Sequence, residues 1–174
     1  LVVFLIAQWF LVSHAIKFMI EEYAYTRLDQ DSQSLLAALK PAPHSTNKLT
    51  LTNSDPRFHQ PFSGYYYQIR IGDSVLNSRS LWDFDLNQIA VGIGKTIRST
   101  AQGPGQQTLL VQTRGFKKNN QHIVIAVSED ATPIRGSIIE FQTYYAIVSV
   151  AILLILVGSQ LVMLKRSFRP MDDV

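Results

Sequence analysis

The strongest constraint on this chain is an uncharged, apolar run of 21 residues near its C-terminal end, over residues 144–164. A bilayer core about 30 Å thick needs about 20 helical residues to cross it. The run therefore predicts a transmembrane helix over residues 144–164.

A second apolar run opens the chain over residues 1–20, and its first charge is Lys17. A cleaved signal peptide would need a small-residue cleavage site of the A-x-A kind. No such site occurs over residues 13–25. We therefore expect residues 1–20 to be a retained anchor and a second transmembrane helix.

The orientation follows from the basic residues directly after the second run, Lys165, Arg166 and Arg169. Positive charge beside a membrane helix marks the cytoplasmic side, so we expect residues 165–174 in the cytoplasm. Two spans then place residues 21–143 on the other side. In a Gram-negative bacterium this means an inner-membrane protein with a periplasmic middle domain.

The middle segment, residues 21–143, holds 12 Lys and Arg against 11 Asp and Glu, a net charge of +1. This balance gives no support to nucleic-acid binding. The histidines are scattered, at His14, His44, His59 and His122. They lack the spacing of a metal site, and no nucleophile stands beside a base. We expect no catalytic residues, no metal and no cofactor in this chain.

Residues 17–40 contain neither Gly nor Pro. Three leucines recur there at helical spacing: Leu28, Leu35 and Leu39. We expect the first membrane helix to continue outward as an amphipathic helix that stops at Pro41 and Pro43. The polar stretch over residues 41–64 predicts a loop with one short strand at 48–52.

Alternating apolar and polar residues predict two β-hairpins. The first covers residues 65–80 and turns at Gly72 and Asp73. The second joins residues 107–116 to residues 122–128 through the polar residues between them. Antiparallel pairing is expected in both.

Residues 123–127 are apolar on both faces, so this strand should be central, with both faces covered. Asp83 or Asp85 is expected to cap a short helix through Ile89. Another helix should begin at Pro133 and run into the second apolar run. The order predicts an α+β domain around a central antiparallel sheet, with long N- and C-terminal helices continuous with the two transmembrane helices.

Aromatic and guanidinium side chains gather on the first hairpin and on neighbouring elements. They are Tyr65, Tyr67, Arg70, Arg79, Trp82 and Arg114. Together such side chains can line a pocket for a small anion, which makes these six the candidate ligand-binding residues. The pattern favours the alternative, in which alternate tyrosines and the tryptophan fill the core and the arginines face solvent.

Residues 62–86, FSGYYYQIRIGDSVLNSRSLWDFDL, resemble the extracytoplasmic sensor region of proteobacterial two-component sensor histidine kinases. In those proteins a Gly, aromatic residues and Gln-Ile precede Ser-Arg-Ser-Leu-Trp-Asp. Residues 126–134, AVSEDATPI, resemble the same proteins, and residues 166–174, RSFRPMDDV, are similar to the start of a HAMP linker.

The resemblance implies a PAS-like (PDC-type) sensor domain in a homodimer. The full-length protein would then continue into HAMP, a histidine-bearing helix pair and a domain that binds ATP and Mg²⁺. Its cytoplasmic partner would be a response regulator, and its input an unknown periplasmic ligand or protein.

We expect four residues to take part in relaying the signal: Pro133, Ile138, Phe141 and Pro170. Dimerisation along the membrane-proximal helices predicts crosslinks between cysteines placed at Leu28 and Leu35. Two alternatives stay open. One is the sensor part of a chemoreceptor or a cyclic-dinucleotide enzyme, and the other is a membrane-anchored binding module without a signalling role.

Overall fold

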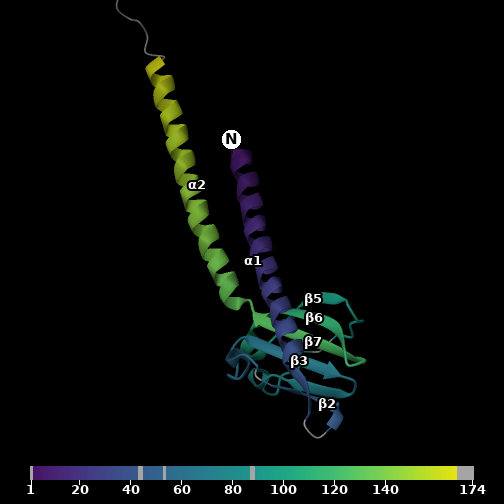
Figure 1. Ribbon diagram of the computed structural model, residues 1–174. Coiled ribbons are helices and arrows are strands. Elements are labelled where there is room, and N and C mark those ends of the chain that lie inside the picture. The colour runs from purple at the N-terminus through teal and green to yellow at the C-terminus, as the bar shows by residue number, and fades with distance from the viewer. Residues whose placement is uncertain (1, 43–44, 53, 87–88, 168–174) are drawn as a thin grey trace, which may run out of the picture. The chain divides into compact units, whose positions relative to one another are not determined.

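The computed structural model describes residues 2–42, 45–52, 54–86 and 89–167. Its two long helices are α1, Val2–Ala38, and α2, Thr132–Ser167 (Figure 1). The chain divides into two compact units. The sheet domain is Phe18–Ile134, and the helical unit combines Leu1–Lys17 with Arg135–Val174.

In the helical unit, Gly136–Lys165 of α2 is a helical stretch of 30 residues that reaches a mean hydropathy of 2.6. It is the one stretch in the described residues that is long and apolar enough to cross a membrane, by length and composition alone. It contains the predicted span at 144–164. The first predicted span, over residues 1–20, is helical from Val2 on and stays a prediction as a membrane segment.

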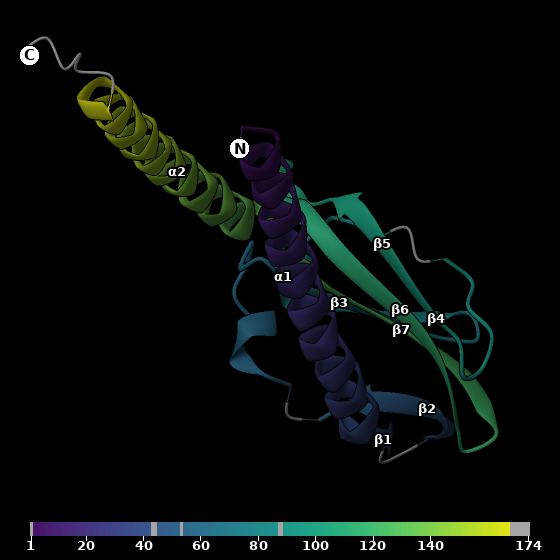
Figure 2. The ribbon, with the colours of Figure 1, turned by 90° about the horizontal axis from the view of Figure 1, so that it is seen from above.

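A five-stranded antiparallel sheet forms the centre of the sheet domain (Figure 2). Its strands are β3 (Tyr65–Ile71), β4 (Ser74–Asn77), β5 (Thr96–Gln102), β6 (Thr108–Lys118) and β7 (Gln121–Asp130), in the order β4-β3-β7-β6-β5. The prediction that residues 123–127 form a central strand is confirmed, because β7 pairs with β3 on one side and β6 on the other.

Both predicted hairpins are confirmed. In the first, β3 pairs with β4 around Gly72 and Asp73. In the second, β6 pairs with β7 around Asn119 and Asn120, whose φ angles are 49° and 61°. Two-residue hairpin turns require such positive φ angles, and asparagine adopts them more readily than most residues.

The part of α1 after Phe18 lies across one face of the sheet (Figure 2). Its fully buried positions are Ala24, Leu28, Ser32 and Leu35. The three apolar ones, Ala24, Leu28 and Leu35, pack with Tyr67, Ile69, Leu110, Ile123, Ile125 and Val127 of the strands. The expectation that Leu28 and Leu35 lie between two subunits is therefore wrong, because this helix face packs on the sheet of its own chain.

The helix α1 ends at Ala38, ahead of Pro41 as expected. The strands β1 (Leu39–Ala42) and β2 (Ser45–Leu51) then form a two-stranded ribbon, so the predicted short strand exists but starts earlier. Lys118 Nζ donates hydrogen bonds to the carbonyls of Leu36 at 2.6 Å and Leu39 at 2.8 Å. The bond to Leu36 satisfies a carbonyl that the end of a helix leaves without an intrahelical partner, and the bond to Leu39 holds the first residue of β1.

The connection between β4 and β5 covers the second face of the sheet. Its buried Leu81, in the 3₁₀ turn η2 (Arg79–Leu81), and its buried Leu86 pack with Tyr66, Leu109, Val111 and Ala126. The helix expected after Asp83 or Asp85 does not form over residues 82–86. The Asp85 carboxylate accepts a hydrogen bond from the Gln68 side chain at 3.0 Å, which ties this connection to β3.

Gly115 of β6 lets this connection approach the sheet closely. A Cβ atom at this position would lie 2.3 Å from the carbonyl oxygen of Gly92. Gly94 N–H donates to the Gly115 carbonyl at 2.9 Å, and Gly115 N–H donates to the Lys95 carbonyl at 3.1 Å. The edge strand β5 follows directly. Sequence analysis missed it, because its exposed and largely polar residues give no apolar alternation.

Candidate functional site

The predicted tyrosines and Arg70 lie on opposite faces of β3. Tyr65 and Tyr67 face the side of the sheet that α1 covers, whereas Arg70, an odd number of residues away, faces the other side. The Tyr67 ring meets the Phe58 ring edge-on, with centroids 5.0 Å apart. Burial raises the pKa of Tyr67. Tyr67 is therefore a core side chain.

The remaining predicted residues lie elsewhere. Arg79 and Trp82 are exposed side chains at the start of the turn η2 and directly after it, and Trp82 has a φ of 53°. Arg114 lies on the α1 side of the sheet, and its guanidinium pairs with the Asp29 carboxylate. The six predicted ligand-binding residues are thus not gathered in one pocket.

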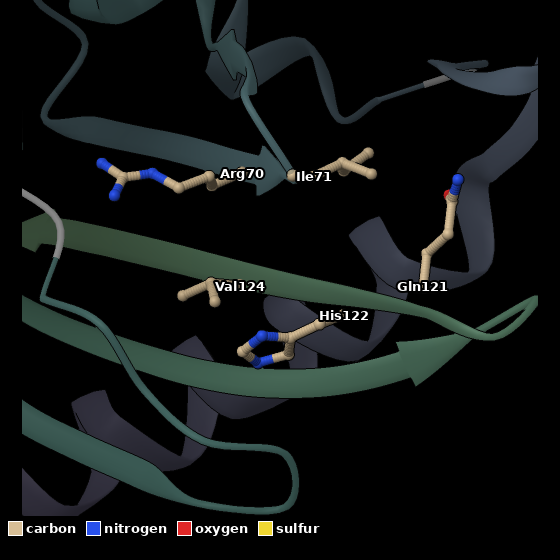
Figure 3. A pocket seen from close by; sticks show the side chains of 6 residues that line it. Arg70, Ile71, Gln121, His122 and Val124 are labelled. Carbon is tan, nitrogen blue, oxygen red and sulfur yellow. The ribbon is translucent and has the colours of Figure 1, made fainter.

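A cavity on the second face of the sheet contains one of the six, Arg70. It consists of two hollows of about 300 and 310 Å³ that share Arg70, His122 and Val124. The other lining residues are Ile71, Gly72 and Gln121 in the first hollow and Ile89, Ala90, Val91 and Gly92 in the second. Figure 3 shows Arg70 and Ile71 leaving β3 in opposite directions, with Val124 and His122 on the neighbouring β7.

The ionisable side chains in the described lining of this cavity are basic. Its described lining includes Arg70 and His122 but no carboxylate. Four other arginines each pair with carboxylates: Arg27 with Glu129, Arg57 with Asp31 and Asp55, Arg98 with Glu22, and Arg114 with Asp29. No cluster of three or more His, Cys, Asp or Glu side chains within the described ranges could hold a metal ion.

On the α1 side, the ring of Tyr65 lies between two guanidinium groups. Arg27 is 5.7 Å and Arg57 4.8 Å from the ring centroid. Arg57 also contacts Asp31 at 3.2 Å and Asp55 at 3.1 Å. Burial raises the pKa of Asp31 although Arg57 opposes it, whereas hydrogen bonds from Arg57 lower the pKa of Asp55. This cluster ties the 3₁₀ turn η1 (Pro56–Phe58) to α1 and β3.

The junction between β7 and α2 is held from several directions. Arg27 of α1 pairs with the buried Glu129, and its Nε donates to Glu129 Oε2 at 3.1 Å. Backbone bonds hold the next two residues: Asp130 N–H donates to Gly64 at 2.7 Å, and Ala131 N–H donates to Thr108 at 2.8 Å. The first residues of α2 therefore follow directly from a point fixed to α1, to β6 and to the turn before β3.

The predicted relay residues are spread along and beyond α2. Pro133 is exposed in its first turn, close to this junction. Ile138 and Phe141 lie further along α2 in the helical unit, where the Phe141 and Tyr145 rings stack 6.4 Å apart. Pro170 lies outside the described residues.

Sequence reasoning missed Arg27, Glu129 and His122 as candidate functional residues. Arg27 and Glu129 are 102 positions apart, so no local pattern signals their contact. His122 is the second residue of β7, directly before its apolar segment, and only the pairing of β7 with β3 brings it near Arg70.

No protein-family profile and no solved structure matches the chain. Among curated proteins, the sensor protein kinase CarS of Pseudomonas aeruginosa is 30% identical to it over 155 residues. The aligned region is 89% of this chain and 34% of CarS, so the chain spans about a third of that relative's length. Most of the chain is therefore similar to one part of a sensor protein kinase.

Proposed function

We propose that this chain is the sensing and signal-transducing region of a two-component sensor histidine kinase. The observation that carries the proposal is the 30% identity to the sensor protein kinase CarS over 89% of the chain. An antiparallel α+β domain between two long helices supports it. The proposal includes a PAS-like character for the sheet domain and a HAMP linker that begins near residue 165.

In the proposed topology, both long helices cross the inner membrane and the sheet domain lies in the periplasm. The apolar stretch Gly136–Lys165 supports the second crossing. The basic residues at its end and directly after it, Lys165 and Arg166, support a cytoplasmic C-terminal end. A cue bound outside then has to reach the cytoplasm along α1 and α2.

The proposed relay uses the way in which both helices are attached to the sheet. The buried face of α1 packs on the strands, and α2 follows the fixed end of β7. A ligand that binds one arrangement of the sheet more tightly than another shifts the balance between the two arrangements. Movement of β7 relative to α1 would be carried into α2 through the Arg27–Glu129 pair and the residues up to Pro133.

The proposal also includes a homodimer with contacts along α1. Since Leu28 and Leu35 face the sheet, the contact surface would be the opposite side of the helix. Exposed residues recur there at spacings of three and four: Met19, Tyr23, Thr26, Gln30, Gln33 and Ala37. This spacing is that of a helix pair.

The test uses the full-length gene product in inverted membrane vesicles with labelled ATP and Mg²⁺. We expect label that is stable to alkali and labile to acid, as phosphohistidine is, and that passes to a response regulator. Residues 1–174 alone, in the same vesicles, serve as the control and should stay unlabelled.

A full-length product without ATP-dependent label would overturn the kinase assignment. Formation of a cyclic dinucleotide from GTP or ATP in the same vesicles would favour the cyclic-dinucleotide enzyme. Absence of both activities would favour a chemoreceptor or a binding module.

A further inference from the structure

Among the described residues that line its cavity, Arg70 has no partner for its charge. Its guanidinium makes no hydrogen bond or ion pair with the residues that the structure describes, and the described lining holds no carboxylate. By contrast, Arg27, Arg57, Arg98 and Arg114 are all held by acidic side chains. A planar guanidinium left free in this way suits a carboxylate or phosphate from outside the chain.

The strand register places a second basic side chain, His122, near Arg70. Arg70 of β3 lies opposite Val124 of β7, and His122 is two residues from Val124 on the same face. Diagonal neighbours of this kind in an antiparallel pair have Cβ atoms about 7 Å apart. Figure 3 shows Arg70, Val124 and His122 around one hollow. In Figure 3 the Arg70 side chain extends along β3, and Val124 lies between it and the His122 ring. Arg70 is exposed and its side chain is long, so a turn of this side chain towards His122 would let one anionic group contact both residues.

Apart from Gln121 in the first hollow, the remaining side chains of the cavity lining are apolar. Val124 forms its floor between the two basic residues, and Ile89 and Val91 of the β4–β5 connection line one side. Its hollows, of about 300 Å³ each, are at the small end of the range for sites that bind small molecules. The lining therefore matches a ligand with an anionic group at one end and a compact apolar body at the other.

We propose that Arg70 and His122 bind the carboxylate of a small organic acid whose apolar body rests on Val124, Ile89 and Val91. The role of this site as the input of the sensor rests on the function proposed above. Binding itself does not depend on that function, and so the two can be tested separately.

The binding test uses residues 1–174 in lipid nanodiscs and isothermal titration with benzoate, a carboxylate with a compact apolar body. We expect Arg70→Gln to weaken benzoate binding about tenfold or more, because the variant loses a charge-assisted bidentate contact. His122→Gln should weaken it several-fold. Arg79→Gln is the matched control, because Arg79 is an exposed arginine outside the cavity lining, and it should bind as the wild type does.

Acetate, phosphate and benzyl alcohol separate the contributions to binding. Each should bind at least several-fold more weakly than benzoate, since each lacks either the apolar body or the carboxylate. Unaltered benzoate binding by Arg70→Gln and His122→Gln, or no benzoate binding by the wild type, would overturn the site. Phosphate binding as tight as benzoate binding would overturn the assignment to a carboxylate with an apolar body.

A second measurement tests the link to signalling. Benzoate added to the periplasmic side should change the phosphorylation of the full-length protein. Arg70→Gln should abolish that response, whereas Arg79→Gln, outside the cavity lining, should keep it. Benzoate binding without a change in phosphorylation would contradict the role as an input site, whereas the existence of the binding site would still hold. Absence of any ATP-dependent phosphorylation would instead count against the proposed kinase function.

Discussion

The carboxylate of Glu129 lies in the interior of the sheet domain, with 4% of the residue exposed. Replacing its partner Arg27 with Met would leave this charge buried without a counter-ion. Loss of one partner of a fully buried pair costs about 3–5 kcal/mol, and the Arg27 side chain is a third exposed. We therefore expect Arg27→Met to lower the free energy of unfolding by about 2–3 kcal/mol in urea titrations of the chain in micelles.

Two further variants separate charge burial from lost packing. The double variant Arg27→Met, Glu129→Gln removes both charges and should recover at least half of the loss. Arg98→Met is the matched control, because Arg98 pairs with Glu22 and both side chains are nearly half exposed. An exposed pair contributes about 0.2–1 kcal/mol. A loss no larger for Arg27→Met than for Arg98→Met would argue against a structural role of the buried pair.

Gly115 is a second residue whose close surroundings limit which side chain the position can hold. In Gly115→Ala the new Cβ would meet the backbone of Gly92, which cannot rotate aside as a side chain can. We expect the free energy of unfolding to fall by about 1–3 kcal/mol, as for other overpacked sites. Gly136→Ala is the control, because nothing lies within 4 Å of the added atom. Equal stability of the two variants would contradict the close approach of residues 91–95 to β6.

At the scale of elements, the end of α1 depends on a side chain from a distant strand. Lys118→Met removes the donor to the carbonyls of Leu36 and Leu39. We expect the last turn of α1 to fray, with faster amide exchange over residues 35–38 and a loss of about 1–2 kcal/mol. Lys117→Met, on the exposed neighbour, should leave exchange in this turn unchanged. The measurement is hydrogen exchange followed by mass spectrometry.

The surface of α1 offers a prediction at the scale of the whole molecule. If two chains associate along α1, a cysteine at Gln30 should crosslink in membranes, because Gln30 is exposed on the face opposite the sheet. A cysteine at Leu28 should not, because Leu28 is buried in its own domain. Crosslinking at Leu28 and not at Gln30 would require α1 to leave the sheet, and no crosslink at either position would count against a dimer along α1.

The topology of the whole molecule is tested by labelling with a membrane-impermeant maleimide. The cysteine of Asp73→Cys, in the turn between β3 and β4, should react in intact spheroplasts. That of Lys165→Cys, at the end of the apolar stretch of α2, should react only after the membrane is opened. Labelling of both cysteines before permeabilisation would contradict two crossings with a cytoplasmic C-terminal end.

Local patterns alone determined several features of this protein. The uncharged run over residues 144–164, the two hairpin turns and the doubly apolar strand at residues 123–127 all follow from neighbours in the chain. Helical periodicity also identified the second half of α1. These features depend on composition, turn chemistry and periodicity over a few residues, which a single sequence displays directly.

Tertiary structure decided which surfaces meet. The leucines at 28 and 35 have the same spacing whether they face a second subunit or a sheet, and only packing made them core. Arg27 and Glu129, and likewise Arg70 and His122, are brought together by strand pairing and helix packing between distant residues. Periodicity shows which residues share a face of an element, whereas the partner of that face depends on how the whole chain buries its apolar surface.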